Sequence, residues 1–337
     1  MTSTLHKLAV LTAVVAFIVI VLGAFVRLSH AGLGCPDWPG CYGQLTWPAD
    51  PHEVTQAARD FPERPVEMHK AWKEMVHRYL AGALVLLVVV INFLSWKAEN
   101  RGKGLRALAA TLLALILFQA ALGMWTVTLK LLPLVVMGHL LGGLATFGLL
   151  LWLAWKSSGA GSRVTSGGLA PFRFAILTGL VVLVIQLALG GWTSANYAAL
   201  ACPDFPSCQG SMWPEADYAE GFVVWREIGV DYEGGVLDLQ ARVAIQMAHR
   251  VGALITLVLL GVLALRLIRT RAVRQDGLVL GALLLAQVIL GIQNVVWQLP
   301  LMNAVAHNAM GALLLAMMLW LTYRSALRPA TAGNPVA

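Results

Sequence analysis

The chain has 337 residues, of which 58% are hydrophobic and only 12% are charged, and its mean hydropathy is +0.73. A soluble globular domain carries roughly a quarter charged residues, so this composition excludes a soluble protein and indicates an integral membrane protein. The formal net charge of +7 does not indicate nucleic-acid binding, because its distribution among the loops accounts for it as a signal of membrane orientation.

Eight apolar runs are long enough to cross roughly 30 Å of hydrocarbon as helices. In chain order we expect these transmembrane helices at residues 8–28, 75–96, 107–127, 134–155, 173–193, 242–266, 277–297 and 303–324. The first run has no small-residue cleavage site behind it and continues into Arg27, so we expect a retained helix and not a signal peptide. The predicted fold class is an all-α integral membrane protein with eight transmembrane helices.

Charge differs between the two sides of the predicted bundle. The termini and the connections at 97–106, 156–173 and 266–276 carry fourteen of the 24 Lys and Arg residues, with only Glu99 and Asp276 as acids. Because Lys and Arg near the ends of spans favour the cytoplasmic side, we expect both termini in the cytoplasm. The two large loops are then periplasmic, and the protein is a multi-pass protein of the bacterial inner membrane.

All four cysteines lie in two similar stretches of the large outer loops, CPDWPGC at 35–41 and CPDFPSC at 202–208. Cysteines outside the cytoplasm are in an oxidising compartment, which favours a disulfide within each stretch, Cys35–Cys41 and Cys202–Cys208. Zinc sites use shorter spacings and further ligands, so metal binding and free thiols are the less favoured alternatives.

The cysteine stretches belong to a longer repeat, in which Cys35 and Cys202 are offset by 167 residues. Further matches follow in the same order: EMVHRYLAG at 74–82 with QMAHRVGAL at 246–254, QAALG at 119–123 with QVILG at 287–291, and GHLLGG at 138–143 with AHNAMG at 306–311. Four spans per half return the chain to its starting side, so both copies have the same orientation.

We therefore predict two tandem-duplicated four-helix bundles, at 1–155 and 173–327. A Gly- and Ser-rich cytoplasmic linker at 156–172 joins them, and a flexible tail follows at 328–337. The Gln-x-x-Leu-Gly pattern occurs again as QLALG at 186–190. There it fits either a glutamine bonded to a neighbouring helix beside a glycine that allows close packing, or a direct role in holding a ligand.

Four of the eight histidines fall in the first turns of spans two, four, six and eight, at one depth below the outer surface: His77, His139, His249 and His307. An ionisable ring in hydrocarbon normally faces a partner or a site. Two imidazoles from two helices, without a nearby carboxylate or thiolate cluster, favour axial coordination of a haem iron over tetrahedral zinc. The other four histidines lie near span ends or in loops, with His69 expected in the outer loop just before the second span.

Small residues follow each of these histidines by four positions, on the same helical face: Ala81, Gly143, Ala253 and Gly311. A flat macrocycle lying along a helix needs this absence of side chain, although ordinary helix packing also uses small residues. The pattern predicts two bis-histidine haem sites, one in each half. Each disulfide loop would then arch as a lid over the haem of its own half.

Two arginines, Arg78 and Arg250, directly follow histidines at the outer boundary. Two roles fit them equally, a charge-assisted bond to a haem propionate and an extension of the side chain into the lipid headgroups.

The two halves differ most clearly one turn before the first histidine, where the first half has Glu74 and the second has Gln246. A carboxylate in an apolar pocket can move protons beside a reacting macrocycle, or it can pair with Arg78 or Lys73. Since the second half keeps its histidine but neutralises this position, we favour the first half as the reactive site.

The first half also has two extra cations on its outer side. Arg27 aligns with Ser194, and Lys130 aligns with Gln298. Both cations are candidate contacts for an anionic tetrapyrrole substrate.

These motifs, EMVHR at 74–78, GHLLGG at 138–143, MAHRVGA at 247–253 and AHNAMGA at 306–312, together with a cysteine pair in each outer loop, resemble the haem A synthase family in its cysteine-pair subtype. The resemblance covers essentially all eight spans. It implies an oxidoreductase that oxidises the C8 methyl group of haem O to a formyl group, which yields haem A for terminal oxidases.

The resemblance also implies the roles of individual residues. His77 and His139 would bind the substrate haem O, His249 and His307 would ligate a cofactor haem b, and Glu74 would be the catalytic carboxylate. Expected partners are haem O synthase, terminal oxidase assembly factors, an electron donor, membrane lipid and a second copy of the chain, but no nucleic acid. The competing interpretations are a diheme b-type electron carrier and a haem transporter or chaperone.

Overall fold

The computed structural model describes residues 2–97, 103–158 and 168–327. Within these ranges eight helices are long and apolar enough to cross a membrane. In chain order they are α1 (Thr2–Leu28), α3 (Met68–Lys97), α4 (Lys103–Thr128), α5 (Pro133–Ser157), α6 (Arg173–Ala195), α8 (Leu239–Arg269), α9 (Arg274–Val296) and α10 (Leu301–Ser325). The prediction of an all-α membrane protein with eight spans is confirmed, and the predicted tail at 328–337 lies outside the described residues.

Several helices extend beyond the predicted spans, and α3 begins at Met68 instead of residue 75. The sequence prediction placed His69 in the outer loop, which is wrong, because His69 lies in the first turn of α3 with an exposed side chain. The apolar pattern marks only the part of a helix that lies in hydrocarbon, whereas the first two turns of α3 are polar.

The outer loops contain two short helices that the sequence analysis did not predict, α2 (Pro51–Asp60) and α7 (Tyr218–Gly221). Helix α2 begins with a capping box, in which the Asp50 side chain accepts from the Glu53 N–H and the Glu53 side chain accepts from the Asp50 N–H. The signal for this helix was present in the sequence, because Asp50, Pro51 and Glu53 stand in the order that starts a helix.

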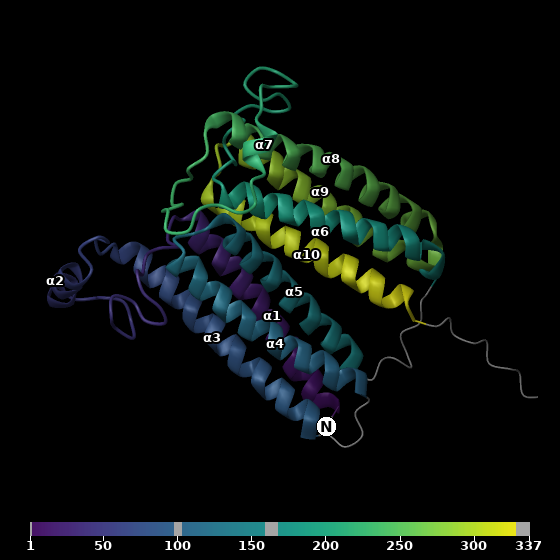
Figure 1. The fold of residues 1–337 in the computed structure, drawn as a ribbon. Coiled ribbons are helices and arrows are strands. Elements are labelled where there is room, and N and C mark those ends of the chain that lie inside the picture. The colour runs from purple at the N-terminus through teal and green to yellow at the C-terminus, as the bar shows by residue number, and fades with distance from the viewer. Residues whose placement is uncertain (1, 98–102, 159–167, 328–337) are drawn as a thin grey trace, which may run out of the picture.

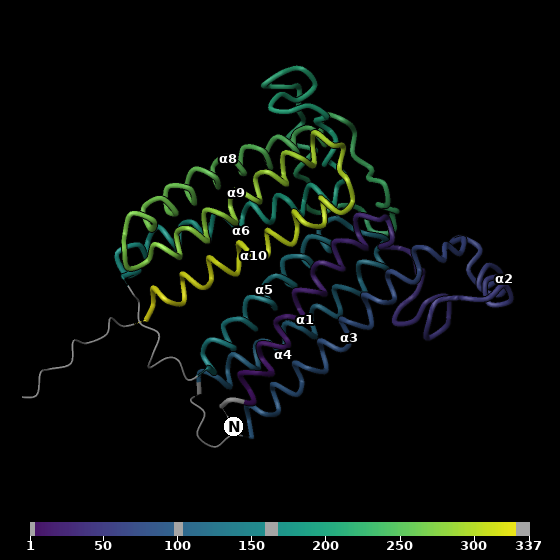
Figure 2. Tube along the Cα trace, turned by 180° about the vertical axis from the view of Figure 1, so that it is seen from behind, coloured from purple at the N-terminus to yellow at the C-terminus, as the bar shows by residue number. Residues whose placement is uncertain are grey.

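The membrane helices form two four-helix bundles that lie side by side (Figures 1 and 2). In the first bundle α1 and α4 each contact both α3 and α5, and in the second α6 and α9 each contact both α8 and α10. The bundles meet where α1 contacts α10, α5 contacts α6, and α5 contacts α10. Exchanging the two halves reproduces this pattern of contacts, as the predicted duplication requires.

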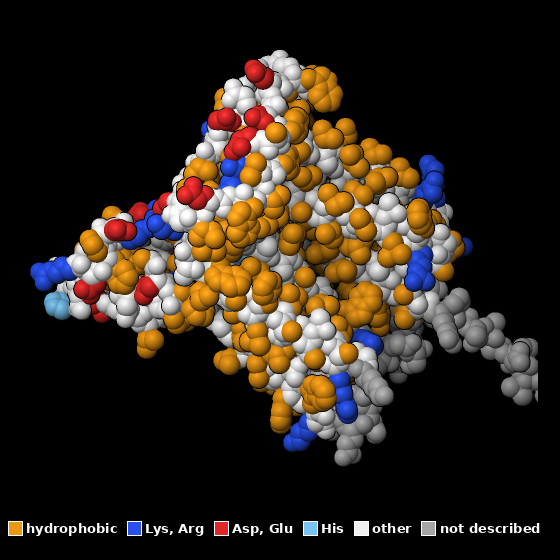
Figure 3. All heavy atoms as spheres, in the orientation of Figure 1, with side chains coloured by type: hydrophobic (Ala, Val, Ile, Leu, Met, Phe, Trp, Pro, Cys, Tyr) orange, Lys and Arg blue, Asp and Glu red, His pale blue; other side chains and the backbone are white. Residues whose placement is uncertain are grey.

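One apolar core runs through both bundles at membrane depth and includes Leu150 of α5 and Met318 of α10. Small residues allow the helices to approach closely. A Cβ at Gly148 would lie 2.8 Å from the Leu319 side chain, across the boundary between the bundles. Large apolar side chains also cover the sides of the bundles (Figure 3), where a membrane protein faces lipid.

The loop of the second half reaches over the first half. Tyr232, in the segment 222–238 before α8, is 3% exposed and packs with Leu33, Leu131 and Leu132. Its N–H donates to the Lys130 carbonyl at 3.0 Å. The segment 222–238 therefore fixes the outer ends of the two bundles to one another.

A second link joins the two outer loops. Arg64, in the loop of the first half, donates to Asp231 at 2.6 Å and to Glu233 at 2.9 Å in the segment 222–238. These three side chains are partly exposed, so the ion pairs contribute little to the free energy of unfolding. Their main effect is to fix the position of one loop against the other.

We expect Tyr232→Ala to loosen this connection, because it removes a buried aromatic ring, at a cost of about 3 kcal/mol. Thermal unfolding of the detergent-solubilised protein should shift to lower temperature, and trypsin should cut faster after Arg226. The matched control is Tyr218→Ala, since Tyr218 is 51% exposed in the same loop. Equal shifts for the two variants would contradict the assigned packing.

Candidate functional site

The four histidines form two pairs inside the two bundles. His77 on α3 pairs with His139 on α5, and His249 on α8 pairs with His307 on α10. The two helices of a pair stand diagonally in their bundle, because each contacts the same two neighbours. The two histidines of a pair therefore come from helices that lie opposite one another across the bundle.

A glycine of the neighbouring helix lies against every one of these imidazole rings. A Cβ built on the glycine would lie 2.9–3.3 Å from the ring Cε1 atom, for Gly23 at His77, Gly123 at His139, Gly190 at His249 and Gly291 at His307. Real Cβ atoms are rarely that close to a neighbour, so the ring occupies the space that a side chain would take. The sequence repeats included Gly123, Gly190 and Gly291, with packing or a role in holding a ligand as the alternatives at Gly190. Gly23 was missed, although Leu-Gly recurs at the matching place in all four helices.

Three of the four rings have a buried Nδ1 atom without a hydrogen-bond partner among the described residues: His77, His139 and His307. Buried polar atoms are nearly always bonded, so an orphaned nitrogen is evidence against a histidine that merely stabilises the fold. His249 differs, because its Nδ1 lies 3.0 Å from Gln186 Nε2.

These features fit a haem held between two imidazoles. In the part of the chain that the structure describes, no three His, Cys, Asp or Glu residues gather into a metal site. A haem iron needs only two protein ligands, since the porphyrin supplies the other four. The residues four positions after the histidines are Ala or Gly, and the cradling glycines leave the rings beside bare backbone.

Glu74 lies one turn before His77 on α3 and is only 4% exposed. Its carboxylate accepts from the Cys35 N–H at 2.9 Å and forms an ion pair with Arg78. Of the two cations that the sequence offered as partners, the structure selects Arg78. At the matching place Gln246 is also buried, and its Oε1 atom has no partner among the described residues.

The two disulfides are confirmed, since Cys35 pairs with Cys41 and Cys202 pairs with Cys208. An aspartate organises each loop from within. Asp204 accepts from the Ser207 hydroxyl and from the N–H groups of Gln209 and Gly210, which lowers the pKa of its carboxyl to about 2.

Arg78 and Arg250 hold these loops on the histidine-bearing helices. Arg78 donates to the carbonyls of Asp37 at 2.8 Å and Gly40 at 2.5 Å. The two terminal nitrogens of Arg250 donate to the backbone carbonyls of Cys202 at 3.0 Å, Asp204 at 2.8 Å and Ser207 at 2.7 Å.

Sequence reasoning missed this role of the two arginines. The signal was available, because the His-Arg pair and the cysteine stretch are repeated together. Contact with haem propionates stays a prediction for both residues.

The two other predicted cations lie elsewhere. Arg27, at the end of α1, donates to the Ser194 carbonyl at 2.7 Å and lies 4.0 Å from the centre of the Tyr197 ring, so it joins the two halves. The Lys130 side chain is exposed, and its backbone carbonyl binds Tyr232. A role for either cation in substrate binding stays a prediction.

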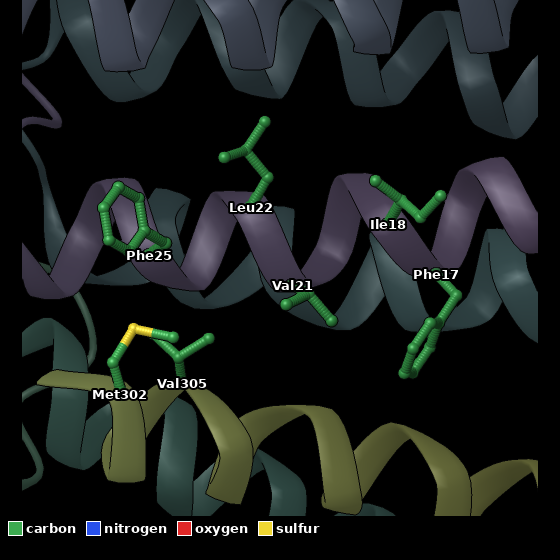
Figure 4. Close-up of a pocket in the computed structure, with 7 residues that line it drawn as sticks. All are labelled: Phe17, Ile18, Val21, Leu22, Phe25, Met302 and Val305. Atoms are coloured by element: carbon green, nitrogen blue, oxygen red, sulfur yellow. The ribbon is translucent and has the colours of Figure 1, made fainter.

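An apolar groove lies between α1 and α10 (Figure 4). It is lined by Phe17, Ile18, Val21, Leu22, Phe25, Met302 and Val305. By helical spacing Val21 and Phe25 lie on the opposite side of α1 from Gly23, so the groove is separate from the histidine pair. It contains no side chain that could carry chemistry.

Arg250→Ala should release the second cysteine loop, because the loop carbonyls lose charge-assisted hydrogen bonds worth about 1.5–3 kcal/mol each before compensation by water. We expect faster hydrogen exchange over residues 202–211 by mass spectrometry, with the disulfide intact. Arg242→Ala is the control, since this half-buried arginine on the same helix donates to the Asp238 carbonyl at the start of its own helix and not to the cysteine loop. Unchanged exchange in Arg250→Ala would refute the anchoring role.

Comparison with known proteins gives a consistent result over nearly the whole chain. Residues 6–319 match the family described as cytochrome oxidase assembly protein. The haem A synthase of Shewanella oneidensis is 47% identical over 316 residues, which cover 93% of this chain and 94% of the relative.

More distant relatives carry the same name. The haem A synthase of Novosphingobium aromaticivorans is 28% identical over 337 residues, with 91% of each chain covered. That of Geobacillus thermodenitrificans is 25% identical over 348 residues, with 99% of this chain and 96% of the relative covered.

Proposed function

The chain belongs to the family of cytochrome oxidase assembly proteins that includes the haem A synthases, and we propose that it oxidises the C8 methyl group of haem O to the formyl group of haem A. It is then an oxidoreductase of haem A biosynthesis. The two histidine pairs inside the bundles, each with glycine against its rings, are the observation that carries this proposal.

We assign the substrate to the first half and the cofactor to the second. His77 and His139 would hold haem O, and His249 and His307 would hold haem b. The difference between Glu74 and Gln246 supports this assignment, because only the first pair has a carboxylate one turn away. When bound, haem b would supply one-electron redox chemistry.

Glu74 is the proposed catalytic residue. Oxidation of a methyl group to an aldehyde releases protons, and a carboxylate beside the ring can accept them. Its two contacts, the Cys35 N–H and the Arg78 guanidinium, orient the carboxylate without filling all of its acceptor positions. The cysteine loop, held by Arg78, would keep bulk water from this carboxylate and act as a lid.

We propose that the cysteine loops are periplasmic and that both termini are cytoplasmic, in a bacterial inner membrane. Two observations support this orientation. Both loops contain disulfides, which persist in oxidising compartments. On the face shown in Figure 3, acidic side chains gather over the loops, and the far ends of the helices carry Lys and Arg.

The reaction requires partners that handle its substrate and product. We propose that haem O synthase delivers haem O, that terminal oxidase assembly factors receive haem A, and that a membrane electron donor serves the second half. Membrane lipid surrounds the helices, and association with a second copy of the chain stays part of the proposal.

Glu74→Gln should abolish synthesis of haem A while both histidine pairs remain. We expect haem O to accumulate and haem A to fall by about 100-fold or more, the scale of a lost general acid or base. Pigments extracted from the membranes and separated by chromatography measure this ratio. Glu67→Gln, at an exposed carboxylate just before α3, is the control and should keep wild-type pigments.

A wild-type ratio of haem A to haem O in Glu74→Gln would remove the catalytic role. Haem b alone in both proteins would favour an electron carrier, and bound haem without any oxidation would favour a transporter or chaperone.

His249→Met should alter the haem b spectrum before it alters the substrate haem, because methionine replaces one of two imidazole ligands in the second half. Optical spectra of the reduced, purified protein follow both pigments, and His77→Met serves as the matched variant in the first half. Loss of only the substrate haem in His249→Met would reverse the assignment of the halves.

A further inference from the structure

The four histidines differ in the residue that lies one turn before the glycine that contacts their ring. It is a glutamine in three helices, Gln119 on α4, Gln186 on α6 and Gln287 on α9, but it is Val19 on α1. Residues four apart share one face of a helix, so each of these side chains belongs to the face that meets the histidine-bearing helix.

Gln186 contacts both the ring and the backbone of His249. Its Nε2 atom lies 3.0 Å from His249 Nδ1 and donates to the His249 carbonyl at 3.1 Å. Gly252, three residues after His249, gives the amide its room, since a Cβ there would lie 2.3 Å from Gln186 Oε1. The glutamine and the glycine act together to bring an amide against the ring.

His77 lacks both members of this pair. Val19 stands where Gln186 stands and packs into the apolar core, and Leu80 stands where Gly252 stands. The Nδ1 atom of His77 accordingly has no partner among the described residues. This ring lies against the backbone at Gly23.

The other two glutamines are intermediate cases. Gln119 has room against Gly142, but neither of its amide atoms has a partner among the described residues. Gln287 Nε2 lies 3.3 Å from Nε2 of His307 and does not contact Nδ1. In the described structure only His249 has a side chain bonded to its Nδ1 atom.

We propose that Gln186 is a positioning residue that fixes His249 as a permanent axial ligand, and that Val19 leaves His77 as the ligand that is most easily displaced. This inference rests on the proposed function, in which the second half keeps its haem and the first half exchanges substrate for product. A hydrogen bond at the second ring nitrogen fixes the orientation of a ligating imidazole and raises its basicity, typically with a 10- to 100-fold effect on affinity.

The chemistry of the amide allows this role in the haem-bound protein. An imidazole that ligates iron through Nε2 carries its proton on Nδ1. A glutamine amide has a donor and an acceptor, and in the structure the Nε2 donor of Gln186 faces Nδ1. If the amide turns over by 180°, its unpartnered Oε1 atom takes the place of Nε2 and accepts the Nδ1 proton. Valine offers neither group.

The test uses the purified, haem-loaded full chain and reads the ligand, not the activity. Gln186→Val copies the first half, and we expect carbon monoxide to bind the reduced second-half haem about 10-fold faster, with a matching loss of haem during detergent chromatography. Gln119→Val, the same substitution in the first half, should leave the second-half haem unchanged. Gln186→Glu keeps an acceptor and should restore slow binding.

A reciprocal variant tests the other half. Val19→Gln combined with Leu80→Gly supplies His77 with the missing pair, and we expect carbon monoxide to bind the first-half haem about 10-fold more slowly. This variant also tests the inference if the Gln186→Val protein does not fold.

Wild-type rates in both folded variants would overturn the inference while leaving the proposed function intact. A wild-type protein that binds no haem would instead overturn the proposed function itself.

Discussion

An imidazole ring at membrane depth needs space beside it and hydrogen-bond partners for its nitrogens. In this protein all four rings have the space, but most of them lack a partner at Nδ1 among the described residues. Four glycines on neighbouring helices give each ring a surface of bare backbone. Three of the rings nevertheless keep an unbonded Nδ1 atom in an apolar interior, where such atoms are expensive to leave unpaired. Under the proposed function a haem bound between the rings would satisfy this constraint, because its iron bonds one nitrogen of each imidazole.

The two bundles share one arrangement of helices and loops. Both hold a disulfide loop on an arginine that follows the first histidine, at Arg78 and at Arg250. They differ at two matching positions, where the first half has the carboxylate of Glu74 and the apolar Val19 and the second half has the amides of Gln246 and Gln186. Under the proposed function, both differences would make the first half the more reactive and the less tightly liganded site. The segment 222–238 and Arg27 join the outer ends of the two halves.

The sequence predicted the features that depend on composition and repetition. Long apolar runs favour helices in a membrane, and two cysteines separated by five residues outside the cytoplasm favour a disulfide within each stretch. It failed where the outcome depends on contacts between distant residues. The burial of Tyr232 under the opposite half, and the capture of loop carbonyls by Arg250, need the loop conformation, which hydropathy does not encode. The start of α3 at Met68 was missed because its first turns are polar.

The central claim is that each histidine pair coordinates one haem iron through its two imidazoles. Near-infrared magnetic circular dichroism of the purified oxidised protein, combined with a measurement of haem per polypeptide, tests this claim most directly. The account predicts a signal of low-spin iron with two imidazole ligands from each half when haem O is supplied. A colourless protein that contains zinc, or iron with a single imidazole in both halves, would contradict it.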